Sequence, residues 1–496
     1  MDYPFDQKTK EILNILQKNL SEGEKIYLVG GMVRDILMSQ PIHDHDFVFV
    51  GDVRKYAIKI ADLLGAAFFM LNDKYKTARI INRDENPSWK NIDMIQMRGN
   101  SIEEDLRQRD ITINAIAIDV ELQNKLIDPL SGALHLHQKL LVACSTNSFI
   151  DDPIRVLRAI RQSTTYQWRI EAKTLKLMKQ ACVLIPNISL ERKRDELMRI
   201  LDLQNPMPAL NLLDHLGLLE IIFPDNKDFR QNWDVESHFS FTNWEEIKLI
   251  LKNLLLLEKA LVLEYQPGNA IDLRTGQVVM KLGRFRAYLS DFFEKRIHTE
   301  RSLRSLLFLT VILSRNKFTI NTRKDNDENY QNLLFGFDKS IRKFVLTNEE
   351  IKLASIINAN REMIHVLAVE NEELNGGEVY QFFRKLGAAG ILLCFLILAE
   401  TMSSVNQVFP EKQFNSELQI CRTLMTGYFQ KSDEWINPPS LVDGYDLKKI
   451  IHENEAIFIG EWLEKVRIAT AEGTLSNKAE AIQYVKKNYL QSSDNI

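Results

Sequence analysis

Two adjacent glycines, Gly30 and Gly31, connect an apolar run to a helical pattern near the start of the chain. The apolar run covers residues 26–29, so a backbone turn without side chains leads directly into a helix N-terminus. Unpaired N–H groups and the helix dipole favour phosphate at such a point. Taken alone, however, double glycines fit an ordinary strand-to-helix turn better than a phosphate site.

Two aspartates downstream, Asp44 and Asp46, change this balance because they lie in a run rich in Val and Phe. Residues two apart in a strand project from one face, so both carboxylates can reach one metal site. Asp is depleted in strands, and we therefore favour metal binding over a solvated loop edge. Mg²⁺ prefers such oxygen ligands and shares them with substrate phosphates, which predicts phosphoryl or nucleotidyl transfer. Asp93, in a later strand-like run, could add a third carboxylate or simply end a strand.

The composition limits the class of protein. The chain has 496 residues, 45% of them hydrophobic, which suffices for roughly three or four domains. Its net charge of −4 argues against non-specific coating of nucleic acid, so an RNA-binding surface must be local. The four cysteines form no C-x-x-C pair, which argues against structural zinc and disulfides. The acidic N-terminal segment and the absence of an apolar stretch of about 20 residues predict a cytoplasmic protein without a signal peptide or membrane span.

The pattern along the chain divides it into a mixed head and a helical remainder. Strand-like runs lie at residues 26–29, 47–50, 92–96 and 111–119. A helical pattern lies between them at residues 53–64. From Pro153 onward, apolar residues recur at spacings of three and four, which predicts helices almost to the C-terminus. The polar segment 323–332 predicts an exposed loop.

A further group, Asp152, Pro153, Arg155 and Arg158, predicts the start of a helix with Asp152 as N-cap and Pro153 as the first helical residue. The three-residue steps place the aspartate and the two arginines on one side of the first turns. An aspartate acceptor beside an arginine donor matches the pairing edges of cytosine and adenine. Uracil and guanine present the opposite pattern, which would leave buried polar groups unpaired at roughly 1 to 3 kcal/mol each.

Two charged groups are less specific on their own. Arg109 and Asp110 lie where a dense charge cluster meets an apolar segment, so their side chains can point into a cleft. Arg192 and Glu196 are four residues apart on a predicted helix, and the ordinary interpretation is a surface ion pair that contributes little stability.

Together, these groups resemble, in order and spacing, the signatures of the class II tRNA nucleotidyltransferase and bacterial poly(A) polymerase family of the polymerase beta superfamily. The resemblance implies that Asp44 and Asp46 hold Mg²⁺ and are catalytic, and that Asp110 contacts the ribose 2′-hydroxyl. It also implies that Asp152 and Arg155 read the base, with Arg109 positioning Asp152. The remaining nucleotide-binding residues would be Gly30, Gly31, Arg34 near the triphosphate and Arg158 near the nucleotide. Gln108 departs from the family pattern, in which an arginine is usual.

The implied fold is α+β, with a polymerase beta-like nucleotidyltransferase head followed by an all-helical neck, body and tail. We expect the catalytic head at residues 1–145, the base-recognising neck at 146–205, the body at 206–345 and a tRNA-binding C-terminal region and tail at 346–496. The body resembles a histidine-aspartate phosphohydrolase domain. It has Ser314 and Arg315 where the paired His and Asp would be expected, so we predict that this chemistry is lost.

The implied activity is addition of C, A or both to the 3′ end of tRNA from CTP and ATP, with release of pyrophosphate. tRNA, ATP and CTP would be the partners, without DNA or a membrane. Two alternatives remain open at the level of sequence: a poly(A) polymerase that acts on RNA 3′ ends, and a catalytically retired RNA-binding protein. The sequence does not decide between CC, A and CCA addition, and it leaves the oligomeric state open.

Overall fold

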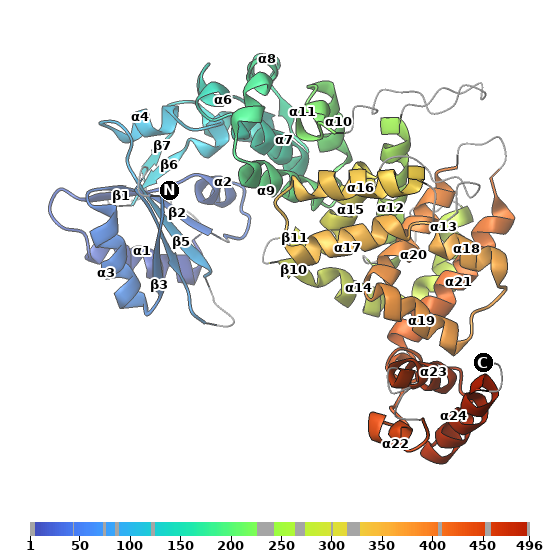
Figure 1. Cartoon of the computed structure of the whole chain (residues 1–496). Coiled ribbons are helices and arrows are strands. Elements are labelled where there is room, and N and C mark those ends of the chain that lie inside the picture. The colour runs from blue at the N-terminus through green and yellow to red at the C-terminus, as the bar shows by residue number, and fades with distance from the viewer. Residues whose placement is uncertain are drawn as a thin grey trace. The chain divides into compact units, whose positions relative to one another are not determined.

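The computed structural model describes most of the chain in two compact units (Figure 1). One unit comprises Met1–Glu196 with Pro208–Ile222, and the other comprises Leu197–Met207 with Phe223–Ile496. The described residues are 5–42, 44–72, 76–84, 89–120, 125–225, 243–262, 273–298, 301–314, 328–404, 409–451 and 458–493.

The first unit is built on a seven-stranded mixed sheet with strand order β3-β4-β5-β2-β1-β6-β7. Its strands are β1 Lys25–Val29, β2 Asp44–Val50, β3 Ala67–Asn72, β4 Thr77–Ile81, β5 Asn91–Gln96, β6 Ala117–Asp119 and β7 Lys125–Ile127. The central strands β2 and β5 are parallel, and the other neighbouring pairs are antiparallel. The strands expected at residues 26–29, 47–50 and 92–96 are therefore present.

Side chains alternate between the two faces of this sheet. One face forms a core with helices, and the other face carries the site. Phe47 and Phe49 of β2 belong to the core with helices α1 Gln7–Lys18, α2 Gly31–Leu37 and α3 Val53–Leu64. Phe49 stacks on Tyr56 of α3 with ring centroids 4.3 Å apart. Val48 faces the opposite side, in a cluster with helix α4 Ile102–Arg107. By this alternation, the even-numbered positions of β2, which include Asp46, lie on the α4 side.

One predicted strand is only partly formed. Residues 111–119 were expected to be extended, but Thr112–Asn114 form a 3₁₀ turn before β6 begins at Ala117. The Thr112 N–H bonds to the carbonyl of Val142 at 2.9 Å, and the Asn114 side chain reaches back to Asp110. These contacts satisfy polar groups that a continuous strand would direct elsewhere, and they bend the segment.

The rest of the first unit is mainly helical. Its helices are α5 Gly132–His137, α6 Ser148–Asp151, α7 Ile154–Tyr166, α8 Ala172–Ala181, α9 Leu190–Leu201, α10 Met207–His215 and α11 Leu219–Ile222, of which α9 and α10 extend into the second unit. A two-stranded parallel ladder, β8 Leu140–Leu141 with β9 Arg169–Ile170, interrupts the expected all-helical neck. It joins the chain before and after α6 and α7.

In the described part of the second unit, the secondary structure is helical apart from the short pair β10 Arg296–His298 and β11 Arg301–Ser302. Its helices are α12 Asn243–Leu261, α13 Leu273–Leu282, α14 Arg286–Glu294, α15 Leu303–Leu313, α16 Glu328–Arg342, α17 Asn348–Ala359, α18 Met363–Glu370, α19 Gly376–Leu386, α20 Ala389–Met402, α21 Glu411–Phe429, α22 Gly444–Lys448, α23 Ile459–Ala471 and α24 Lys478–Ser493. The loop predicted at 323–332 is wrong from Glu328 onward, where α16 begins with polar residues and continues to the buried Phe337 and Ile341. Residues 323–327 lie outside the described part of the chain.

The end of the chain has an apolar core of its own, in which Trp462 and Val466 of α23 pack with Ala481 and Val485 of α24. Among the described residues, none of the helices alone has the length and apolar character of a membrane span. The pair α19 and α20, bent by 100°, reaches those limits together by length and composition.

A buried ion pair in the second unit gives a stability prediction. Glu350 is fully buried and accepts hydrogen bonds from Arg301, Nε to Oε1 at 2.6 Å and Nη2 to Oε2 at 3.1 Å. Glu350→Gln leaves this arginine buried without its counter-charge, so we expect the free energy of unfolding to fall by about 3 kcal/mol. Urea unfolding at neutral pH measures this loss, with Glu349→Gln, an exposed neighbour, as the control.

The same pair gives the sign of a pH effect. Burial alone would raise the pKa of Glu350, but hydrogen bonds from Arg301 and Thr347 outweigh it and hold the pKa below the ordinary 4.5. A depressed folded pKa gives stability that is present above 4.5 and is lost as the pH falls through the folded value. The difference between wild type and Glu350→Gln should therefore shrink below pH 4.5. A difference that grows on acidification would contradict this assignment.

Candidate functional site

The glycine turn forms the floor of the site. Gly30 caps α2 with φ +69°, in the left-handed region that favours glycine. A Cβ at this position would lie 3.3 Å from Arg109 Nη1 and 3.4 Å from Asp46 Oδ2. A Cβ on Gly31 would lie 3.3 Å from Arg34 Nη2. The two missing side chains thus leave room for an acid and two arginines directly over the turn.

Asp46 is the carboxylate that the structure places at this turn. It pairs in register with Asp93 across the parallel β2 and β5, while Asp44 occupies the position two residues earlier in β2, opposite Asn91. Asp93 is held by Arg79, Nε to Oδ1 and Nη2 to Oδ2, both at 2.7 Å. This two-bond pair makes Asp93 a structural partner of β4, and we leave it outside the predicted metal set.

The described side chains include no cluster of three or more His, Cys, Asp or Glu that could hold a metal ion. The side chain of Asp44 is not among them, so the predicted pair is tested here by its donor chemistry. Two strand-borne carboxylates, one of them over a glycine that leaves space above the turn, fit a hard divalent cation that completes its shell with phosphate and water.

Arg109 is fixed by an acid that the sequence did not single out. Asp105 is fully buried and accepts hydrogen bonds at its Oδ2 from Arg109 Nε at 3.2 Å and Nη2 at 3.1 Å. The described contacts of Arg109 are to Asp105 and to the Asn114 carbonyl, so its expected role in positioning Asp152 stays a prediction. Asp152 is instead bonded by Arg192, whose Nη2 donates to Asp152 Oδ2 at 2.7 Å. The four-residue spacing of Asp105 and Arg109 near the end of α4 is typical of an ion pair on a helix and could have indicated this contact.

Asp110 is buried and surrounded by donors. The Ile111 N–H bonds to its Oδ1 at 2.9 Å, Asn114 Nδ2 bonds to the same oxygen at 3.2 Å, and Arg158 Nη2 lies 3.4 Å from Oδ2. Burial by itself would raise the pKa of Asp110, but Arg158 and these hydrogen bonds hold it below the ordinary 3.8. The carboxylate is thus ionised at neutral pH and acts as an acceptor.

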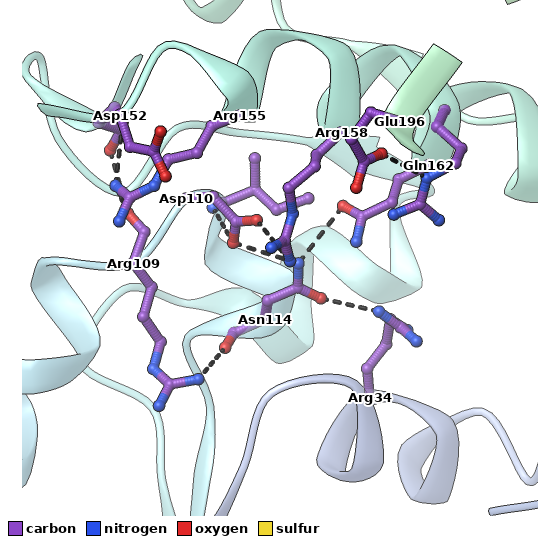
Figure 2. Close-up of polar contacts among 12 residues, drawn as sticks. Arg34, Arg109, Asp110, Asn114, Asp152, Arg155, Arg158, Gln162 and Glu196 are labelled. Atoms are coloured by element: carbon purple, nitrogen blue, oxygen red, sulfur yellow. Dashed lines mark hydrogen bonds and ion pairs between the residues drawn. The ribbon is translucent and has the colours of Figure 1, made fainter. Parts of the chain in front are cut away.

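Asp152 and Arg155, both labelled in Figure 2, are held by the protein independently of each other. Asp152 follows α6 in an extended conformation, and α7 begins only at Ile154 after Pro153. The predicted side-chain N-cap at Asp152 and helical start at Pro153 are both wrong, because the carboxylate is directed to Arg192 instead. Arg155 donates to the carbonyls of Gln108, Ser148 and Arg109 at 3.1, 3.0 and 3.4 Å, respectively.

Arg34 is more enclosed than expected. Its Nη1 donates to Asn114 Oδ1 at 2.8 Å, its Nε to Asp35 at 2.9 Å, and its guanidinium lies 5.0 Å from the ring centroid of Tyr166 on α7. Glu196 accepts from Arg161 at 2.9 Å, and Arg192 donates to Asp152. These two contacts replace the pairing of Glu196 with Arg192 that the sequence predicts. Asn114 and Gln162 hydrogen-bond each other at 3.3 Å. Gln162 was missed by the sequence analysis, whereas Asn114 lies in the segment 111–115 that follows Arg109 and Asp110 in the resemblance, without having been singled out.

Of the two positions where the phosphohydrolase pair would be expected, the structure describes Ser314. Ser314 hydrogen-bonds Asn358 at 2.8 Å. Arg315 lies outside the described residues, and so does the segment 234–238, whose His238 is the one histidine that the resemblance to this site keeps.

Family models match two segments of the chain, one on each side of residues 143–167, which carry Asp152, Arg155 and Arg158. The model described as the Poly A polymerase head domain matches residues 26–142. The model described as a probable RNA and SrmB-binding site of polymerase A matches residues 168–229. The first match contains every proposed residue of the head, which confirms the predicted type of head domain.

Curated relatives carry related names. A CC-adding tRNA nucleotidyltransferase of Geobacter sulfurreducens is 36% identical over 197 residues, which make up 40% of this chain and 45% of that protein. The chain thus spans less than half of that relative. A protein of the same name from a Synechocystis species is 24% identical over 462 residues, 93% of this chain and 92% of that protein.

Solved structures establish the fold. A CCA-adding enzyme in apo form I matches with a TM-score of 0.62 and 21% identity, covering 97% of this chain and 94% of that chain. The Thermotoga maritima CCA-adding enzyme complexed with tRNA matches with a TM-score of 0.60 and 21% identity, covering 98% and 96%, respectively. The head therefore belongs to the Poly A polymerase head-domain family, the chain is similar to curated tRNA nucleotidyltransferases, and it shares its fold with solved CCA-adding enzymes.

Proposed function

We propose that this protein adds C, or C and A, to the 3′ end of tRNA from CTP and ATP, with release of pyrophosphate. The observation that carries the proposal is the continuity of the site within one compact unit. Asp46 and Arg109 meet over Gly30, and the backbone of residues 108–109 is bonded to Arg155. These contacts connect the residues expected to carry the catalysis with the residues expected to read the base.

Asp44 and Asp46 would hold the divalent metal, which we propose to be Mg²⁺ because the ligands are hard carboxylate oxygens. When bound, the metal activates the attacking 3′-hydroxyl and stabilises the charge of the leaving pyrophosphate. Asp110 would accept a hydrogen bond from the ribose 2′-hydroxyl, since its lowered pKa keeps it ionised at neutral pH. Gly30, Gly31 and Arg34 would border the triphosphate at the start of α2.

Asp152 and Arg155 would select the base without a nucleic-acid template. A carboxylate accepts from the exocyclic amine of cytosine or adenine, and a guanidinium donates to the neighbouring ring nitrogen. Arg192 would set the direction of Asp152, and three backbone carbonyls set that of Arg155. Arg158 would act next to them by holding Asp110.

The relatives' names divide between CC addition and CCA addition. Two relatives are named CC-adding enzymes, and one of them aligns with nearly the whole chain. We therefore propose two C additions as the main reaction. The C-terminal unit would bind tRNA, a proposal supported by its likeness to a structure complexed with tRNA. The domain boundaries at 145, 205 and 345 and the cytoplasmic location remain predictions.

One assay separates the candidate functions. Purified protein is incubated with Mg²⁺ and each labelled nucleotide separately, on tRNA ending before the first C, on tRNA ending after CC, and on unstructured RNA. CC addition predicts two C residues on the first RNA and none on the others. Addition of A to the second RNA would indicate CCA synthesis, and extension of unstructured RNA by ATP alone would indicate a poly(A) polymerase. A lack of incorporation on all three would favour the retired RNA-binding protein.

A further inference from the structure

The edge strand β3 of the described sheet carries two exposed apolar side chains. Phe69 is 51% exposed and Leu71 is 50% exposed. Phe68 and Met70, the residues that alternate with them, pack against the core on one face of the sheet. Because side chains alternate along a strand, Phe69 and Leu71 lie together on the opposite face. Exposed apolar side chains that lie together are typical of a surface that contacts another molecule.

The strand register shows that this is the face that carries Asp46. Asp46 of β2 lies opposite Asp93 of β5. In the next two strand pairs, Arg79 of β4 lies opposite both Asp93 and Phe69. Residues directly opposite each other point to the same face, and neighbouring strands are about 4.8 Å apart, so Phe69 lies roughly 14 Å from Asp46 along the sheet.

The strand order indicates which substrate this part of the face would meet. β1, which leads into Gly30, and β6, which follows Asp110, lie on one side of β2, whereas β5, β4 and β3 lie on the other side. In an in-line displacement, the attacking hydroxyl and the leaving pyrophosphate lie on opposite sides of the α-phosphate. With the triphosphate at the glycine turn, the 3′ end of the RNA therefore approaches over β5, β4 and β3.

The chemistry of this surface suits a nucleobase better than a phosphate. Arg79 and Asp93 bond each other twice at 2.7 Å, so their charges cancel, and the surface beyond them is an aromatic ring beside a leucine. Bases at single-stranded RNA ends stack on aromatic side chains. Such stacking tolerates any base, because every base has a π-face.

We propose that Phe69, with Leu71 beside it, stacks against the bases at the 3′ end of the RNA and so holds the attacking hydroxyl near Asp46. This inference rests on the proposed function, in which the metal ligands on β2 join a nucleotide to an RNA end. It assigns no chemical step to Phe69. Its expected effect is on the affinity for the terminal bases of the RNA and not on the choice of nucleotide.

The test measures the equilibrium binding of two RNAs by the full-length protein, in the presence of Mg²⁺ and without nucleotide. One RNA is tRNA that lacks its CCA end, and the other is the same tRNA with abasic residues at its last two positions. We expect wild type to bind the first RNA about 10-fold more tightly. Phe69→Ala should lose most of this preference, whereas Phe69→Trp, which keeps an aromatic face, should retain it. The control is Leu63→Ala, which removes a similarly exposed apolar side chain from α3.

Incorporation of C into the first RNA separates this inference from the proposed function. If wild type adds C but binds both RNAs equally, or if Phe69→Ala keeps the full preference, the inference is overturned while the proposed function stands. If Phe69→Ala loses the preference but wild type adds no nucleotide, the RNA-end contact holds and the proposed catalytic function fails. A change of oligomeric state in Phe69→Ala with an unchanged preference would overturn the inference in favour of a protein contact at this edge.

Discussion

Asp46→Ala is expected to lower the rate of C incorporation by about 10³-fold, equivalent to about 4 kcal/mol of transition-state stabilisation. The reason is that Asp46 is one of the two carboxylates proposed to hold the metal, and it lies over the turn that would receive the triphosphate. Single-turnover incorporation of labelled CTP into tRNA lacking its 3′ end measures the loss. Binding of the tRNA itself should change little, because Asp46 belongs to the catalytic face of the head.

The matched control is Asp62→Ala, which removes an exposed aspartate from α3 of the same unit. It should retain the wild-type rate and the wild-type melting temperature. Incorporation by Asp46→Ala at a rate close to that of the control would remove Asp46 from the catalytic set. The retired RNA-binding alternative would then gain support only if wild type were equally inactive.

Asp152→Asn is expected to lower the ratio of kcat/KM for CTP to that for UTP by roughly 10- to 100-fold. The substitution turns a pure acceptor into a group that can also donate, so the mismatch with the uracil carbonyl is relieved. The estimate takes one or two unpaired buried groups at roughly 1 to 3 kcal/mol each. Steady-state kinetics with the two nucleotides measure the ratio, and the adjacent Asp151→Asn is the control.

Arg192→Ala tests whether the direction of Asp152 matters. The Arg192 and Asp152 side chains are 54% and 30% exposed, so loss of this solvent-screened pair should cost little stability. The CTP to UTP ratio should nevertheless fall, by less than in Asp152→Asn. An unchanged ratio in both variants would show that base selection lies elsewhere in the neck.

Much of the head could be predicted because its signals are local. Periodicity alone placed the helix at Val53–Leu64, and apolar runs placed β1 and β2, the second of which carries the predicted metal ligands. Apolar residues in these segments recur with the period of a strand or a helix, and this period determines which face is buried. Tertiary contacts then reinforce the local preference.

The neck was less predictable because its decisive contacts cross long distances in sequence. Asp152 has the local signature of an N-cap, yet its carboxylate bonds to Arg192, which is 40 residues away. Asn114 lies in an apolar run with no charge of its own, yet it connects Arg34, 80 residues earlier, with Gln162, 48 residues later. A single sequence does not show which residues far apart along the chain form hydrogen bonds, so these contacts became visible only in the fold.

The most direct test of the account is a sequencing experiment with all four nucleotides present at equal concentration. Wild-type protein is incubated with Mg²⁺ and tRNA that lacks its 3′ end, and the added residues are sequenced. The account predicts that C is added first and that U and G remain rare, because Asp152 and Arg155 match only cytosine and adenine. Addition of U or G as often as C, under conditions where Asp46→Ala adds nothing, would contradict base selection by the protein.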